Sequence, residues 1–317
     1  MNDETAPMTL LAPPANVEIV EVAPRDGFQS IRDPLPTIDK QRCISALVDA
    51  GITRLEIGSF VSPKAIPQMA DTGKLIEAFA DRPALRLSAL VPNLKGAELA
   101  LAHGIREVVY VVSVSESHNR SNVRRSVEES LEDLGRVAER LRQTEGTRLR
   151  LDLGTCFDCP FEGTIDWQQV DRVLSQATRL ADGLPMEVAL CDTTGRASPY
   201  QVAEHFTQLR ERHGGKGLAW AFHGHDTFGM GVANALFAIH HGATAVDSAC
   251  AGLGGCPFAP GATGNTATED LLYALQGGKV ATGIDLSKLL VAADLIAALP
   301  GGQTASHLRQ VPRERMR

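Results

Sequence analysis

The chain has 317 residues, of which 44% are hydrophobic and 22% are charged, a composition typical of a soluble globular enzyme with a large core. Its formal net charge is −7, and no Lys/Arg run is interleaved with aromatic residues, which argues against nucleic-acid or membrane-surface binding. The chain has no apolar run of about 18 residues, the minimum for a membrane span. Residues 1–16 lack Lys and Arg and do not resemble a leader peptide, so we expect a cytoplasmic protein.

From residue 17 onward, short β-branched runs alternate eight times with longer helical patterns, and no Pro/Ser-rich linker divides them. This alternation predicts a (β/α)8 TIM barrel, an α/β fold, over residues 17–300, flanked by tails at 1–16 and 301–317. An open doubly wound sheet would carry a Gly-x-Gly-x-x-Gly turn after its first strand, and residues 23–27 do not fit one. The predicted strands are 18–22, 54–57, 86–91, 107–112, 148–153, 186–190, 218–222 and 244–248.

Capping signals mark several helix starts. Thr37 and Asn93 are expected as single N-cap residues, and capping boxes, with Glu three residues after Ser or Thr, begin at Ser126 and Thr266. A last helical stretch over 285–299 lies outside the eightfold pattern. Its apolar stripe either covers the barrel or forms a homodimer contact, and the sequence does not choose between them.

The active site of a (β/α)8 barrel forms at the C-terminal ends of its strands, so polar residues there are candidates for function. Any one of them alone is equally well explained as a helix cap or a satisfied core group. Their shared position favours a common site. The candidates are Arg25, Asp26, Glu56, Asp192, His223, His225, Cys256 and Asn265.

The run 251–274 places Cys256 and Asn265 in a loop that contains five glycines and precedes a helix. So many glycines indicate positive φ angles or close approach of the backbone to a ligand. We interpret Cys256 as an acid/base group or nucleophile that this loop brings to a substrate. The alternative is a structural cysteine in an ordinary loop.

His223-Gly224-His225 is the clearest metal signal, because residues i and i+2 of a strand point to the same face. With Asp26 and the Asn265 carbonyl they supply two nitrogen and two oxygen ligands. A set without thiolate suits an octahedral divalent ion, Mg²⁺ or Mn²⁺, better than structural zinc. Arg25 adjoins this set, and its guanidinium either stabilises a substrate oxygen that gains charge or forms a salt bridge to Glu21 or Glu56.

Five segments together resemble the 3-hydroxy-3-methylglutaryl-CoA lyase family over about residues 17–300. The Arg-Asp-Gly and His-x-His motifs are shared with a wider group of metal-dependent lyases and Claisen-condensing barrels, whereas the Gly-Leu-Gly-Gly-Cys-Pro loop is specific to the lyases. The segments are 20–29 (VEVAPRDGFQ), 59–64 (SFVSPK), 67–69 (PQM), 223–226 (HGHD) and 252–258 (GLGGCPF).

The resemblance implies a retro-Claisen cleavage of 3-hydroxy-3-methylglutaryl-CoA to acetyl-CoA and acetoacetate, dependent on a divalent metal. A base, His223 or Asp26, would take the proton of the tertiary hydroxyl while the C–C bond breaks. The nucleotide end of the acyl-CoA is expected near Lys64 or the basic stretch 120–125. The implied roles are metal ligation by Asp26, His223, His225 and Asn265, a carbonyl clamp by Arg25, acid/base work by Cys256, active-site positions for Glu56 and Asp192, and support from Glu21.

Several positions depart from the usual family pattern and bear on the substrate more than on the chemistry. Ala65 stands where the family pattern has a tryptophan. A tryptophan side chain buries roughly 150–250 Å², so the alanine leaves room for a longer acyl branch. The other departures are Ala23 and Cys191 in place of glycine, Ser30-Ile31 in place of Asn-Glu, and Arg124 in place of asparagine.

Three alternatives to the ordinary family reaction stay open. The same cleavage could act on a 3-hydroxyacyl-CoA with a larger 3-substituent. The barrel could instead form C–C bonds, as isopropylmalate and homocitrate synthases do, although it lacks their C-terminal regulatory domain and carries the Cys256 loop. A non-catalytic metal- or CoA-binding barrel would bind the ion without turnover.

Overall fold

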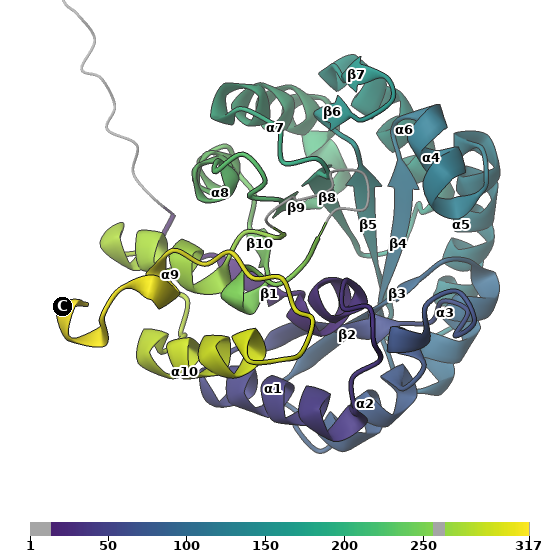
Figure 1. Cartoon of the computed structure of the whole chain (residues 1–317). Coiled ribbons are helices and arrows are strands. Elements are labelled where there is room, and N and C mark those ends of the chain that lie inside the picture. Colours follow the sequence, from purple (N-terminus) through teal and green to yellow (C-terminus); the bar gives the residue numbers. More distant parts are fainter. Residues whose placement is uncertain (1–13, 256–263, 317) are drawn as a thin grey trace, which may run out of the picture.

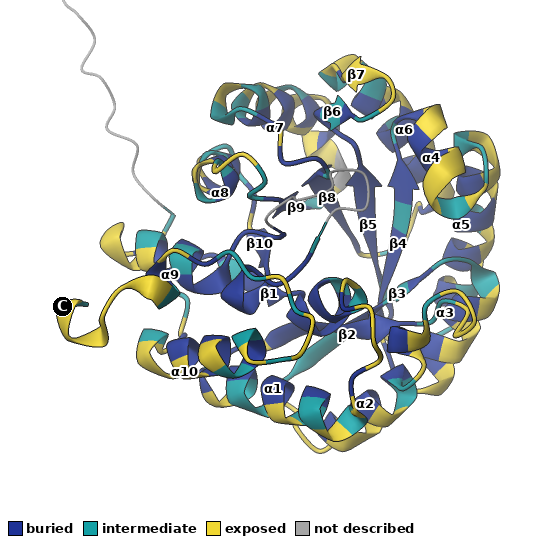
Figure 2. Ribbon diagram, viewed as in Figure 1, coloured by how far each residue is buried: buried dark blue, intermediate teal, exposed yellow. Residues whose placement is uncertain are grey.

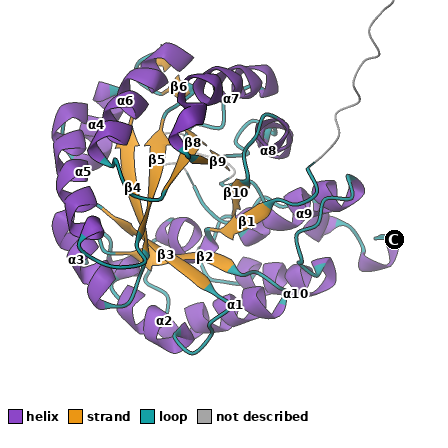
Figure 3. Cartoon of the chain, turned by 180° about the vertical axis from the view of Figure 1, so that it is seen from behind, coloured by secondary structure: helices purple, strands orange, loops and turns teal. Residues whose placement is uncertain are grey.

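The computed structural model describes residues 14–255 and 264–316. Eight parallel strands close into a barrel in the order β1-β10-β9-β8-β5-β4-β3-β2, with helices around the outside, which confirms the predicted fold (Figures 1 and 3). The predicted strand ends lie within two residues of the observed ones. The barrel strands are β1 Glu18–Glu21, β2 Arg54–Ser59, β3 Arg86–Val91, β4 Glu107–Ser113, β5 Arg148–Gly154, β8 Met186–Asp192, β9 Ala219–Gly224 and β10 Ala245–Ser248.

Helices α1 to α8 lie between successive strands, α9 and α10 follow the last strand, and together they surround the barrel (Figure 3). A small antiparallel pair, β6 Asp158–Cys159 and β7 Gly163–Thr164, interrupts the loop after β5 and was not predicted. No described helix is long and apolar enough to span a membrane. The helices are α1 Thr37–Asp49, α2 Thr72–Phe79, α3 Leu94–Ala102, α4 Glu116–Val123, α5 Val127–Arg142, α6 Trp167–Leu180, α7 Pro199–His213, α8 Gly231–His240, α9 Thr268–Gly277 and α10 Leu286–Ala297.

The apolar core lies between the strands and the helices, where alternate strand residues point outward. Figure 2 shows the barrel strands as largely buried. Phe222 of β9, for example, packs on Phe206 of α7 with ring centroids 6.4 Å apart. The residues of opposite parity point into the barrel, and many of them are charged. The hydrophobic shell therefore holds the barrel together from outside, while its interior is polar.

Buried ion pairs link the inward-facing side chains. Arg54 lies 2.6 Å from both Glu107 and Glu187, and Arg150 lies 3.1 Å from Glu187 and 2.6 Å from Asp247. Buried charges are tolerated only when they are paired in this way. The network connects the interior of the barrel to the strand ends where the candidate site lies.

Two of the four predicted caps are confirmed, and two are wrong. Asn93 caps α3 by accepting the Gly96 amide, and Ser126 forms a reciprocal capping box at the start of α5. Thr37 does not cap α1: the helix begins at Thr37 itself, and the hydroxyl donates to Asp71 Oδ2 at 2.8 Å. The contact with the next helix takes the hydroxyl away from its own backbone.

The capping box predicted at Thr266 is also wrong. Helix α9 begins two residues later, after Ala267, and has no side-chain cap. Thr266 donates its hydroxyl to Gly224 O at 2.8 Å, and Glu269 accepts the Ala251 amide at 3.0 Å. Both side chains tie the last loop of the barrel to its neighbours.

The segments expected as tails contact the barrel where the structure describes them. Asn16 pairs with Ala281, and the Ala305 amide donates to Ala251 O at 3.1 Å. Ser306 and Leu308 are buried. The apolar stripe of α10 is buried against α1 and α9 of the same chain, which accounts for that stripe without a partner copy.

Candidate active site

A cavity of about 640 Å³ opens at the C-terminal ends of the strands. One side, from β2, β3 and β4 and their loops, is mainly apolar; the other, from the turn after β1 and from β5, β8 and β9, is polar. The apolar side includes Val61, Ala65, Ile66, Leu90, Pro92 and Val111, and the polar side includes Arg25, Asp26, Asp152, Thr193, His223 and His225.

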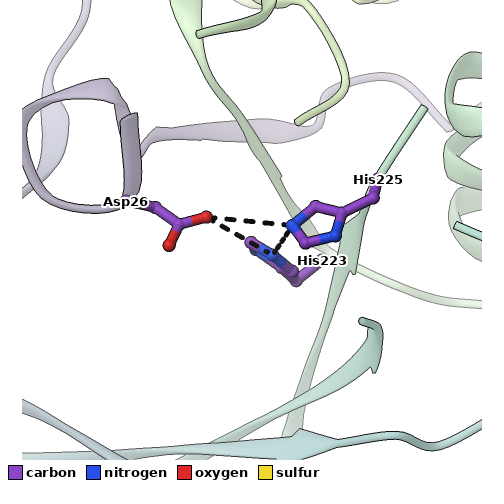
Figure 4. Close-up of side chains that lie close together, drawn as sticks. All are labelled: Asp26, His223 and His225. Carbon is purple, nitrogen blue, oxygen red and sulfur yellow. Dashed lines mark hydrogen bonds and ion pairs between the residues drawn. The ribbon is translucent and has the colours of Figure 1, made fainter. Parts of the chain in front are cut away.

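Three side chains on the polar side converge on one point (Figure 4). Asp26 comes from a π-helical turn after β1, His223 ends β9, and His225 follows it. The two Nε2 atoms lie 3.4 Å apart, and Asp26 Oδ2 lies 4.0 Å from His223 Nε2 and 3.9 Å from His225 Nε2. One ligand atom from each residue lies within 4.8 Å of the others, a spacing that one metal ion can bridge.

Both imidazoles are oriented by their other ring nitrogen. His223 Nδ1 lies 3.0 Å from Asp247 Oδ2, and His225 Nδ1 lies 2.7 Å from the carbonyl oxygen of Thr193. These oxygens accept hydrogen bonds, so each Nδ1 carries a proton and Nε2 is the ring nitrogen that faces Asp26. A carboxylate or carbonyl behind a ligating imidazole is the usual arrangement at protein metal sites.

Asn265 completes the cluster. Its Nδ2 donates to Asp26 Oδ2 at 2.9 Å and to Leu253 O at 3.2 Å, while its Oδ1 is buried without a hydrogen-bond partner among the described residues. Residue 265 also pairs with His225 through an antiparallel bridge. A buried amide oxygen without a donor is costly unless an ion or water meets it. These residues therefore fit a divalent cation with mixed nitrogen and oxygen ligands.

Arg25 lies between two carboxylates, 2.5 Å from Asp26 Oδ1 and 2.9 Å from Glu56 Oε1. Burial alone would raise the pKa of Asp26, but Arg25 and the two histidines outweigh it and hold that pKa well below its usual range. Glu21 is not the partner of Arg25. It accepts the backbone amides of Ala23 and Cys250 instead.

Besides Asn265, three sequence candidates lie outside the described cavity lining. Glu56 stands behind Arg25, and burial raises its pKa to about 7. Asp192 accepts the amide of Ala197 and thereby holds the turn that carries Thr193; burial raises the pKa of Asp192 to about 6. Cys256 falls outside the described residues.

Sequence reasoning did not single out Asp247, Thr193 or Asp152. Asp247 and Asp152 sit inside strands at positions that point into the barrel, and both are at least 95% buried. A charged residue in the middle of a predicted barrel strand was the available signal. The carbonyl of Thr193 carries no side-chain signature, so its role could be seen only in the structure.

Three of the departures from the family pattern, Ala65, Arg124 and Cys191, border the cavity. Ala23 is buried in the turn that precedes Asp26, and Ile31 is buried below it. Half of the differences therefore fall on the surface that a substrate would meet.

A closed parallel barrel with this cluster at its mouth defines a class of metal-binding barrel enzymes, and the comparisons place the chain within that class. The family model described as HMGL-like matches residues 16–296. The chain is 38% identical to the 3-hydroxy-3-isohexenylglutaryl-CoA/hydroxy-methylglutaryl-CoA lyase of Pseudomonas aeruginosa, covering 92% of this chain and 96% of the relative. It is 39% identical to the (R)-citramalyl-CoA lyase of Chloroflexus aurantiacus, covering 90% and 91%.

Solved structures agree. The HMG-CoA lyase of Bacillus subtilis superposes with a TM-score of 0.87 at 38% identity, covering 94% of this chain and 98% of the other. An HMG-CoA lyase of Acinetobacter baumannii, solved with coenzyme A and 3-methylmalate, gives a TM-score of 0.85 at 36% identity, covering 95% and 97%. The chain belongs to the HMGL-like family and is a hydroxymethylglutaryl-CoA lyase-like enzyme.

Proposed function

We propose that this enzyme cleaves 3-hydroxy-3-methylglutaryl-CoA to acetyl-CoA and acetoacetate with the help of Mg²⁺ or Mn²⁺. The observation that carries the proposal is the convergence of two oriented imidazoles and Asp26 within one cavity. The lyase names of the full-length relatives support the reaction class, and the A. baumannii structure with coenzyme A supports an acyl-CoA substrate.

Asp26, His223, His225 and Asn265 would hold the ion. Bound there, a divalent cation would act as a Lewis acid that lowers the pKa of the substrate hydroxyl. Three of the four ligating groups, the two imidazoles and the Asp26 carboxylate, are already held in place by other hydrogen bonds. The fourth, Asn265 Oδ1, accepts no hydrogen bond from the described residues. Such preorganisation means that little rearrangement is needed when substrate binds.

Arg25 is suited to stabilise the negative charge that develops on the thioester oxygen as the C–C bond breaks. Its guanidinium borders the cavity, and the carboxylates of Asp26 and Glu56 fix its position. Cys256 would deliver the proton that converts the enolate to acetyl-CoA. We assign Glu56 and Asp192 supporting roles, because one holds Arg25 and the other holds the turn of Thr193.

The test is turnover of 3-hydroxy-3-methylglutaryl-CoA by the purified enzyme, followed as acetyl-CoA release with Mg²⁺ or Mn²⁺. We expect activity that is lost with EDTA, restored by metal, and reduced at least 100-fold in Cys256→Ala, as expected for loss of a general acid or base. A wild-type protein that binds metal but releases no acetyl-CoA from this substrate would contradict the assignment.

A second candidate is the same cleavage with a larger 3-substituent, and the apolar side of the cavity favours it. Val61, Ile66, Leu90 and Val111 border the cavity there together with Ala65, which contributes only a methyl group. An extended hydrocarbon branch would bury itself against these side chains at about 25 cal/mol per Å². The name of the P. aeruginosa relative shows that such branches are handled within the family.

Ala65→Trp separates the two candidates. If the enzyme accepts long branches, the indole should lower kcat/KM for 3-hydroxy-3-isohexenylglutaryl-CoA at least 10-fold and change kcat/KM for the methyl substrate less than 3-fold. Ala70→Trp is the matched control, because Ala70 is exposed and does not border the cavity. Equal losses with both substrates would show that the apolar side does not hold the branch.

A further inference from the structure

The mouth of the cavity carries an arginine without an acidic partner. Arg124 is exposed and borders the cavity, and its guanidinium forms no hydrogen bond or ion pair with the residues that the structure describes. The other two arginines of the described lining are paired. Arg25 lies between two carboxylates, and Arg125 lies 3.1 Å from Asp133. Arg124 is therefore the arginine of the lining that remains available to an anion.

Other cations that follow the strand ends are less suited to meet an anion in the cavity. Arg120 does not border the described cavity, and it pairs with Glu116 at 2.7 Å. Lys64, after β2, and Lys95, in α3, are exposed and also lie outside the described lining. The sequence placed the nucleotide end of an acyl-CoA near Lys64 or residues 120–125. The geometry narrows that region to one side chain.

The backbone at Arg124 is held in an unfavourable conformation. The residue ends α4 with φ +58° and ψ 32°, in the left-handed region that disfavours residues with a Cβ atom. Buried Asn119 fixes the turn by donating to Arg125 O at 3.0 Å and to Ser126 O at 2.9 Å. Its Oδ1 accepts the amide of Ser113, at the end of β4. Strain of this kind persists where the surroundings over-determine it, and it clusters at ligand sites.

The cavity extends from the buried metal-ligand candidates to this exposed arginine. His223 and His225 are 8% and 7% exposed, whereas Asn122 and Arg124 are exposed, and all four border the same cavity. A thioester that reacts at the buried end would extend its pantetheine chain toward the mouth. Phosphate groups would stay there, because removing a charged group from water is costly. In a chain with a net charge of −7, holding such an anion depends on a local cation.

On the basis of the proposed lyase function, we propose that Arg124 binds the phosphate groups of coenzyme A and so favours CoA thioesters over thioesters of pantetheine, which has no phosphate. A guanidinium presents a planar set of N–H donors that matches phosphate oxygens. The asparagine of the usual family pattern has no charge, so this ion pair would be a property of this chain. Phosphates take no part in C–C cleavage. Arg124 should therefore affect KM and leave kcat unchanged.

The experiment measures kcat and KM at about 50 mM KCl for 3-hydroxy-3-methylglutaryl-CoA and for the same acyl group on pantetheine. Arg124→Asn should raise KM for the CoA thioester about 5-fold, the effect of losing one charge-assisted contact at a partly exposed site. Its kcat should stay within 2-fold of wild type, and so should both constants for the pantetheine thioester. Arg124→Lys keeps the charge and should stay within 3-fold of wild type on both substrates.

Arg120→Asn is the matched control, since it removes the same charge from α4 outside the cavity lining. It should change KM for both substrates less than 2-fold. High salt gives a second check, because screening weakens an exposed ion pair. At about 0.5 M KCl the difference in KM between Arg124→Asn and wild type should fall below 2-fold.

Titration calorimetry with coenzyme A alone tests the contact without turnover. Arg124→Asn should weaken coenzyme A binding about 5-fold, and Arg120→Asn should leave it within 2-fold of wild type. This readout separates the two proposals. A wild type that cleaves neither thioester contradicts the proposed function, whereas the phosphate contact is then decided by the calorimetry.

Three results would overturn the assignment of Arg124. Equal increases in KM for the CoA and pantetheine thioesters would show that the side chain acts on the acyl chain or on the fold. A change of less than 2-fold in both KM and coenzyme A affinity would show that the phosphates lie elsewhere. An equal loss of affinity in Arg120→Asn would show that only the overall charge of α4 matters.

Discussion

At the scale of single residues, the cluster of Asp26, His223 and His225 is held in place by side chains that would not themselves contact a bound ion. Asp247 Oδ2 accepts from both His223 Nδ1 at 3.0 Å and Arg150 at 2.6 Å, so the imidazole is fixed by a carboxylate that is itself fixed. Removing the charge behind a ligating histidine lowers its basicity and loosens its orientation. The metal affinity should therefore respond to Asp247 although it is not a ligand.

Asp247→Asn is expected to weaken Mn²⁺ binding by about 10- to 100-fold, measured by titration calorimetry of the apoenzyme. The chain offers a matched control in Asp171, which lies 2.7 Å from His213 Nε2 far from the cavity lining. Asp171→Asn removes the same kind of contact and should leave the Mn²⁺ affinity unchanged. Equal affinities for wild type and Asp247→Asn would show that His223 needs no carboxylate behind it.

Arg124 is a residue whose backbone conformation conflicts with its side chain. It ends α4 in the left-handed region, with φ +58°, where asparagine is better tolerated than arginine. Arg124→Asn should raise the free energy of unfolding by about 0.5–1 kcal/mol in a urea titration. Arg120→Asn removes a similar charge inside α4 and, through loss of the ion pair to Glu116, should not stabilise. A less stable Arg124→Asn variant would mean that the arginine side chain makes a compensating contact.

At the scale of elements, the C-terminal segment braces the loop that leads to the site. Gly254 donates its amide to Gln303 O, and Ala305 donates to Ala251 O. The Leu253 carbonyl between these contacts accepts from Asn265 Nδ2. The segment therefore holds the backbone that positions a candidate metal ligand.

Asp270 of α9 anchors this segment by accepting the amides of His307 at 2.8 Å and Leu308 at 2.7 Å. Asp270→Ala should cost about 1–2 kcal/mol of stability, as loss of a similar capping carboxylate does, and should speed amide hydrogen exchange over residues 303–308. Asp294→Ala removes only exposed ion pairs to Arg309 and Arg313 and serves as the control. Unchanged exchange in Asp270→Ala would show that the segment is held by its apolar contacts alone.

The elements themselves were largely predictable, because β-branched runs and helical periodicity are local signals. The failures at Thr37 and Thr266 have a common cause: each hydroxyl bonds to a segment distant in the sequence, Asp71 in one case and Gly224 in the other. Among site residues, the candidate ligands Asp26, His223 and His225 were visible in the sequence, whereas Asp247 and Asp152 were not recognised. A carboxylate within a strand is typical of a solvent-facing position in an open sheet, and only barrel closure turns it inward.

At the scale of the whole molecule, the barrel buries many carboxyl groups. Its free energy of unfolding therefore depends on whether these groups are protonated. Most buried carboxylates there are paired with arginine, as Glu187 and Asp247 are with Arg150. Glu21 is different. It lies outside the barrel interior, fully buried between β1, the turn after β10 and α9, and it has hydrogen-bond donors but no cation among its described partners.

Burial raises the pKa of Glu21 from 4.5 to about 7. Between these values the folded protein holds a proton that the unfolded chain releases, so the stabilisation is complete below about pH 4.5 and is lost as pH rises through 7. One pKa unit corresponds to about 1.4 kcal/mol, so this residue should make the protein about 3 kcal/mol less stable at pH 8 than at pH 4.5.

Glu21→Gln should remove most of that fall, measured by urea unfolding at both pH values with EDTA present. Glu145→Gln, at an exposed position, should retain it. If Glu21→Gln loses as much stability as wild type between the two pH values, the carboxyl is already ionised in the folded state, and its three donors compensate the burial.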